Sequence, residues 1–288
     1  MTSALRLPAP DYQQDNWQVY DLDDRLLLVA TDQITVAGRP LPDRIPAKGQ
    51  ALTQLVIYWY ELFASIIGIN LLSADPVEFP PRFRPLASEL GGRSLLVQKL
   101  PEIPLDCRVV GYLTTTVWPE YQASQTVGGV AVEGGLQPGG HLTDYIYVPF
   151  LEEESHQPIS LQQSTQRFGH HDAMVVCSNT LELYGFAASL ARSRGFLLAE
   201  AAFHFASFDN QIILTGVPTP DNSLFWSATE PLRGADQPGW ERQPLLDWLA
   251  ANAEGQSSRP PLPEDLLAAL SQRYIQLYEA LSAEAFVH

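Results

Sequence analysis

Glu200 and His204 have the residue types and the spacing of an acid–base pair. They lie in the stretch 196–205, FLLAEAAFHF, whose apolar and aromatic character predicts a β-strand. Side chains four residues apart on a strand point to the same side of the sheet. Histidine titrates near neutrality and a carboxylate can exchange a proton, so the pair could perform general acid–base catalysis. The alternative is a hydrogen-bonded pair that only stabilises the fold.

Other reactive side chains give weaker patterns. His170, His171 and Asp172 are consecutive, which is more typical of a helix start capped by an aspartate than of a metal site. Ser178 and Ser223 lack the context of a serine-hydrolase nucleophile. We therefore predict no metal ligands and no bound cofactor.

The charge balance of the chain excludes several classes of partner. The 288 residues contain 17 Lys and Arg against 33 Asp and Glu, a formal net charge of −16, and Lys48 and Lys99 are the only lysines. Such a surface repels phosphate backbones and anionic lipids, so we expect no nucleic-acid and no membrane partner. Cys107 and Cys177 lie in apolar stretches, which indicates buried thiols in a reducing compartment. With no signal-peptide pattern at the N-terminus, we expect a cytoplasmic protein.

Strands and helices alternate irregularly along the chain. Hydrophobic patterning predicts strands at 17–20, 25–31, 94–99, 107–113, 196–205 and 211–217, and helices at 51–67, 160–167, 172–194, 245–251 and 263–281. Hairpins mixed with flanking helices predict an α+β fold. We expect a β-rich lobe with one helix at 1–110, a second α+β lobe completing a cleft at 111–252, and a linker with a C-terminal helix at 253–288.

Seven stretches of the chain, in order and at matching spacing, resemble the SAICAR synthetase (phosphoribosylaminoimidazole-succinocarboxamide synthase) family. They are LLLVATDQIT (26–35), IPAKGQALTQL with YWYELF (45–63), LVQKLPEIPLDCRVVGYL (96–113), VWPEY (117–121), GFLLAEAAFHF (195–205), TPDNSLFW (219–226) and SQRYIQLYEAL (271–281). The resemblance implies a two-lobed α+β fold related to ATP-grasp enzymes. It also implies ligation of aspartate to an aminoimidazole carboxylate nucleotide with ATP and magnesium, often in a small homo-oligomer. The cleft positions that it indicates are Lys48, Lys99, Asp106, Tyr112 and Asp221.

The chain departs from the family at the positions that the resemblance assigns to phosphates and magnesium. Asp15 and Trp17 stand where the family has cations of an ATP-phosphate motif, and Val110 replaces an arginine expected to hold the substrate phosphate. The family's Asp-x-Lys-x-Glu triplet becomes Glu200-Ala-Ala202-Phe-His204, and its Asp-Glu pair becomes Thr215-Gly216. A phosphate at Val110 would lose charge-assisted hydrogen bonds of about 1.5–3 kcal/mol each.

These departures predict a SAICAR-synthetase-like protein that has lost magnesium- and ATP-driven ligation. We expect a repurposed biosynthetic enzyme that acts on a small, weakly charged substrate, a nucleoside or a specialised metabolite, by ATP-independent acid–base or cyclisation chemistry. Glu200 and His204 would be its catalytic residues. A non-catalytic scaffold or regulator is the alternative, and a divergent ATP-dependent aspartate ligase is a third reading.

Overall fold

The chain folds into two compact units. The computed structural model describes residues 7–14, 16–36, 39–151, 158–230, 234, 237–252 and 261–288. The first unit comprises residues 1–60, 70–99 and 241–288, and the second comprises residues 61–69 and 100–240. Asp15 and most of the predicted linker, residues 253–260, lie outside the described residues.

The first unit is built on an antiparallel sheet with the strand order β1-β2-β3-β8-β7. Its strands are β1 (Tyr12–Gln14), β2 (Trp17–Asp21), β3 (Arg25–Ala30), β7 (Leu71–Ser73) and β8 (Ser94–Gln98), and a separate hairpin joins β4 (Gln33–Val36) to β5 (Arg39–Arg44). Its helices are α1 (Lys48–Phe63), which reaches into the second unit from Glu61 on, α2 (Ala87–Leu90), α6 (Gln243–Ala251) and α7 (Glu264–Ser282), with 3-10 turns η1 (Pro76–Glu78) and η2 (Arg84–Leu86). The apolar faces of α1, α6 and α7 share one core cluster with Ile34 and Ile45, which buries the stripe of each amphipathic helix.

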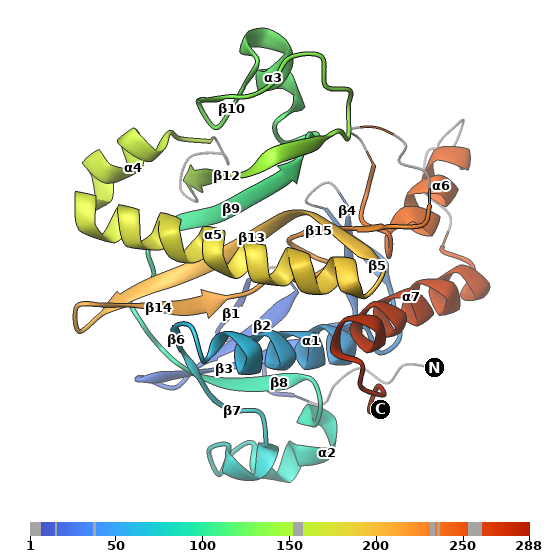
Figure 1. The fold of residues 1–288 in the computed structure, drawn as a ribbon. Helices are drawn as coiled ribbons and strands as arrows, with labels where there is room; N and C mark the ends of the chain where they lie inside the picture. The colour runs from blue at the N-terminus through green and yellow to red at the C-terminus, as the bar shows by residue number, and fades with distance from the viewer. Residues whose placement is uncertain are drawn as a thin grey trace. The chain divides into compact units, whose positions relative to one another are not determined.

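The second unit is built on a larger sheet with the order β12-β9-β13-β14-β6, and β15 also pairs with β13. Its strands are β6 (Gly68–Ile69), β9 (Leu105–Tyr112), β12 (His141–Leu151), β13 (Phe196–Phe208), β14 (Gln211–Gly216) and β15 (Leu224–Ser227), with a small hairpin of β10 (Thr126–Val127) and β11 (Val130–Ala131). The helices are α3 (Trp118–Ser124), α4 (Leu161–Phe168) and α5 (His170–Ser193). Helix α5 packs along β13, β9 and β12 (Figure 1).

Most elements predicted from the sequence are present. The strands predicted at 17–20, 25–31, 94–99, 107–113, 196–205 and 211–217 correspond to β2, β3, β8, β9, β13 and β14. The end of α5 is also as predicted, because Gly195 has a φ of 85°, a left-handed conformation that favours glycine. Both cysteines are buried, which confirms that part of the expectation.

Some boundaries in the structure differ from the pattern in the sequence. The lobe boundary expected after residue 110 falls inside β9, which belongs wholly to the second unit. Strand β12 was not predicted, because its C-terminal half is buried on both faces and therefore lacks alternation. Within the described residues, no helix combines the length and apolar character needed to cross a bilayer.

Candidate functional site

A cluster of buried charges joins β9 to β13 at the centre of the second unit's sheet. Arg108 donates to Oδ2 of Asp106 through Nε and Nη2, at 2.8 and 2.7 Å, and to Oε1 of Glu200 through Nη1 at 2.5 Å. Thr114 Oγ1 donates to the second oxygen of Glu200 at 2.8 Å. The strand register explains the cluster, because Arg108 lies opposite Ala202, whose small side chain leaves room for the guanidinium.

The cluster is shielded from water, so each charge is stabilised by its partners in the cluster rather than by hydration. The Arg108 side chain is 25% exposed, whereas those of Asp106 and Glu200 are 7% and 1% exposed. Burial acts to lower the pKa of Arg108, but the two carboxylates outweigh it and the pKa lies above its ordinary value. Arg108 is therefore a permanent cation whose charge is already balanced. Oδ1 of Asp106 is buried and accepts no hydrogen bond from a described residue, so this carboxylate keeps acceptor capacity.

His204 lies on β13 beyond this cluster. Its register partner is Gly216 on β14, and a Cβ at position 216 would lie 2.5 Å from Nδ1 of His204. The imidazole thus fills the space that a side chain at 216 would need. Four residues on a strand separate the Cα atoms of Glu200 and His204 by about 13 Å, and the Glu200 oxygens are engaged by Arg108 and Thr114. The catalytic role of the pair stays a prediction.

Tyr112 ends β9 in an aromatic setting. Its ring contacts His141 and Trp226 edge-on, at centroid distances of 5.0 and 5.4 Å. Its hydroxyl accepts a hydrogen bond from Arg192 Nη2 at 3.2 Å. Burial raises the pKa of Tyr112, and the nearby Arg192 acts in the opposite direction. The hydroxyl is therefore protonated at neutral pH and oriented by Arg192.

Asp221 lies half-buried in the turn that leads into β15. Asn222 Oδ1 accepts from the backbone N–H of Thr219 at 2.7 Å and stabilises this turn. Ser223 Oγ in turn accepts from the backbone N–H of Ala202 at 3.1 Å. The turn that contains Asp221 is thus tied to β13 two residues from Glu200.

The two lysines lie in the first unit and have different surroundings. Lys48 starts α1 and is buried, with Nζ donating to the backbone oxygen of Gln33 at 3.0 Å and lying 5.5 Å from the centre of the Tyr274 ring. Lys99 forms an exposed ion pair with Asp21 at 2.6 Å. That hydrogen bond raises the pKa of Lys99 and lowers the pKa of Asp21. The structure therefore pairs Asp106 with Glu200 through Arg108, and gives each lysine contacts of its own within the first unit.

Sequence reasoning missed Arg108 and Thr114. Asp106 and Arg108 are two residues apart on β9, and this alternation places both on the same face of the strand. An arginine two residues after an aspartate on a predicted strand was the sequence signal that could have indicated this ion pair. The contact with Glu200 was not visible, because it depends on the register between β9 and β13.

Comparisons with known proteins place the chain in one family. The sequence model of SAICAR synthetase matches residues 14–262. Phosphoribosylaminoimidazole-succinocarboxamide synthases of Desulfosudis oleivorans and Pelobacter propionicus are 33% and 34% identical to it, over 91% and 92% of this chain and 92% and 90% of theirs.

Solved structures agree with this result and confirm the predicted SAICAR-synthetase-like α+β fold. The SAICAR synthase of Saccharomyces cerevisiae, determined in complex with SAICAR, superposes with a TM-score of 0.87 and 29% identity over 96% of both chains. The Pyrococcus horikoshii SAICAR synthetase, at 17% identity and a TM-score of 0.66, shares the fold. The chain belongs to the SAICAR synthetase family.

Proposed function

We propose that this family member has lost magnesium- and ATP-driven ligation and acts on a small, weakly charged molecule. The observation that supports this most directly is the charge balance of Arg108. Its guanidinium is paired with two carboxylates, and Val110 on the same strand is buried in an apolar cluster. A phosphate group in this region would meet a formal excess of negative charge.

The residues present do not fit a magnesium ion at the positions that the family resemblance indicates. Magnesium binds through oxygen ligands, mostly carboxylates. Thr215 and Gly216 supply no carboxylate, and the ring of His204 takes the space in which a side chain at 216 would extend. Glu200, the carboxylate that β13 supplies, is engaged by Arg108 and Thr114. The proposed chemistry therefore involves no step through Mg·ATP.

In the proposed chemistry, His204 exchanges protons with the substrate, because an imidazole has one ring nitrogen that accepts a proton and one that donates it. Glu200 acts as a fixed anion that attracts a polarised donor of the substrate. A nucleoside or a specialised metabolite suits such a site, since its recognition needs hydrogen bonds rather than a cation cluster. The proposed partner is thus a small molecule, and the family resemblance also implies a homo-oligomer.

One observation favours the alternative of a non-catalytic scaffold. Both Glu200 oxygens already accept hydrogen bonds from the protein. A carboxylate with these hydrogen bonds can have a purely structural role, which is to hold β9 and β13 together. The names of the relatives, in turn, support the third reading, a divergent aspartate ligase.

A thermal-shift panel with Mg·ATP, AMP, adenosine, aspartate and an aminoimidazole nucleotide separates the three readings. We expect adenosine to raise the melting temperature more than Mg·ATP does. A Glu200→Gln variant should remove the adenosine effect, whereas Asp209→Asn, an exposed acid at the end of the same hairpin, should retain it.

Two results would contradict the proposal. Stabilisation by Mg·ATP of about 2.7 kcal/mol at a hundredfold excess over its dissociation constant, with aspartate-dependent amide formation, would identify a ligase. A flat response to every compound would favour the scaffold.

A further inference from the structure

A cavity of about 490 Å³ lies beside β12 in the second unit. Strand β12 ends the order of its sheet. The cavity wall consists of residues from β12, the β10–β11 hairpin with the residues that follow it, α4 and α5. Figure 1 shows these elements around β12. A volume of this size is typical of sites that bury a small organic molecule.

The cavity is separate from the charge cluster. Its wall includes neither Glu200 nor Arg108 nor His204. Strand β9 stands between β12 and β13, and neighbouring strands are about 4.8 Å apart, so about 10 Å separate β12 from β13. A ligand bound here would contact none of these three residues.

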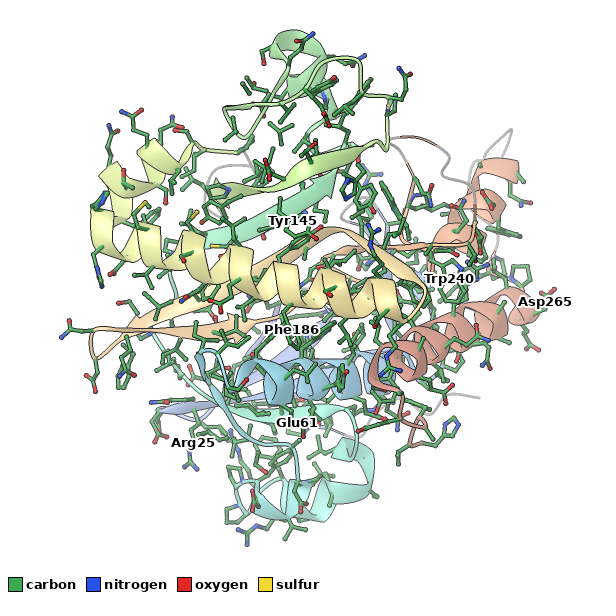
Figure 2. All side chains as sticks on the ribbon, viewed as in Figure 1. Arg25, Glu61, Tyr145, Phe186, Trp240 and Asp265 are labelled. Atoms are coloured by element: carbon green, nitrogen blue, oxygen red, sulfur yellow. The ribbon has the colours of Figure 1, made fainter. Side chains whose placement is uncertain are left out.

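A break in strand pairing shapes the cavity. The register between β12 and β9 shifts between His141 and Ile146, and Leu142 to Tyr145 in this interval contribute to the wall. Irregular strand segments re-aim side chains and are common beside functional sites. Tyr145 is one result: it lies where β12 passes α5 (Figure 2), with its ring 4.8 Å from that of Tyr184.

The walls specify the chemistry of a ligand. They are mostly apolar, with Val130, Leu142, Ile146 and Leu181 among them, and Tyr145 and Tyr147 add aromatic surface. Among the described residues of the wall, the charged ones are Glu133 and Asp144, both exposed, and none is a lysine, arginine or histidine. An anionic ligand would therefore meet repulsion without a counter-charge.

We propose that this cavity binds a second small molecule, an uncharged or singly cationic aromatic compound. Its ring system lies among the aliphatic and tyrosine side chains, and a hydroxyl or ammonium group points towards Glu133 and Asp144. Thr143 Oγ1 already donates to Glu133 Oε1 at 2.9 Å, which holds that carboxylate in place to accept a further donor.

Three probes that share one ring system but differ in charge test the proposal. They are 2-naphthylmethanol, 2-naphthylmethylamine and 2-naphthoic acid. In calorimetric titrations we expect the alcohol and the amine to bind at least tenfold more tightly than the acid. Leu181→Trp should fill the cavity and weaken both by at least tenfold. Leu190→Trp is the matched control, because Leu190 is a partly buried leucine of the same helix outside the wall.

Cys177 supplies a second measurement that needs no substitution. It contributes to the cavity wall, and burial raises the pKa of its thiol, so modification by N-phenylmaleimide should be slow. The alcohol should slow it at least a further fivefold, as measured by peptide mass spectrometry, with buried Cys107 as the internal reference.

Equal binding of the three probes would overturn the proposal, as would equal affinities of the wild type and Leu181→Trp. If Leu181→Trp does not fold, the labelling of wild-type Cys177 decides. A rate unaffected by the alcohol would then refute the site.

Discussion

Arg108 shows how a single residue can stabilise two others that would be costly alone. Asp106 and Glu200 lose most of their hydration in the fold, and the guanidinium replaces it with charge-assisted hydrogen bonds. Removing the cation leaves two carboxylates facing each other in a poorly hydrated place. Such a loss costs more than the net gain from the intact cluster, because the desolvation cost remains.

We therefore expect Arg108→Met to lower the free energy of unfolding by about 3 kcal/mol. Adding Asp106→Asn and Glu200→Gln should restore part of that loss, because the variant then buries neutral amides. Urea denaturation monitored by tryptophan fluorescence measures both effects. Arg25→Met, which removes an exposed pair with Asp24, is the control and should change stability little. Equal effects of Arg25→Met and Arg108→Met would show that the buried cluster has no special role.

At the scale of elements, the hairpin of β13 and β14 depends on the absence of a side chain at Gly216. An added Cβ would lie 2.5 Å from Nδ1 and 3.0 Å from Cβ of His204. Because the second contact involves the base of the side chain, a rotation of the ring alone does not relieve it. The hairpin accommodates His204 only with glycine opposite.

Gly216→Ala should accordingly destabilise the protein by about 1–3 kcal/mol. The same change in a His204→Ala background should cost much less, and a double-mutant cycle from chemical denaturation measures the difference. Gly185→Ala in α5 is the control, since its Cβ would make only an ordinary contact at 3.8 Å. Additive effects of the two substitutions would contradict the steric argument.

The success of sequence reasoning also differed between elements. Helix α7 has a clear periodic pattern of apolar residues, and strand β3 is a short apolar run that follows the acidic turn at Asp23 and Asp24, so both elements are predictable from the sequence. Strand β12 follows a glycine-rich stretch and contains a register shift, and neither feature has a periodic pattern. Contacts such as Arg108 with Glu200 connect residues 92 positions apart, and no local pattern specifies them.

On the scale of the whole molecule, negative charge dominates. A formal net charge of −16 repels itself in the compact state, and this repulsion is long-range and is screened by salt. The fold class was predictable at this scale from the order of strands and helices. The division into two units was harder to predict, because segments that are distant in the sequence, 1–60 and 241–288, belong to the same unit.

We expect the melting temperature at pH 7.5 to rise by about 2–4 °C between 20 and 300 mM KCl, which corresponds to about 1 kcal/mol. Scanning calorimetry measures the change. Near pH 4.6, where the sequence has its isoelectric point, the net repulsion vanishes and the rise should disappear. A melting temperature that falls with salt at pH 7.5 would show that attractive ion pairs outweigh the repulsion.

The pairing of Ala202 with Arg108 has a consequence for how charge is compared among relatives. When sequences are compared one position at a time, this chain has a neutral residue at 202, and the basic residue at 108 is treated as unrelated to it. In the sheet these two positions are neighbours, because the Cβ atoms of directly opposite residues on adjacent strands lie about 4.5–5.5 Å apart. A cation can thus stand at a different position of the sequence and still lie in the same region of the sheet. Charge substitutions in this fold are therefore best compared for pairs of residues that face each other on neighbouring strands.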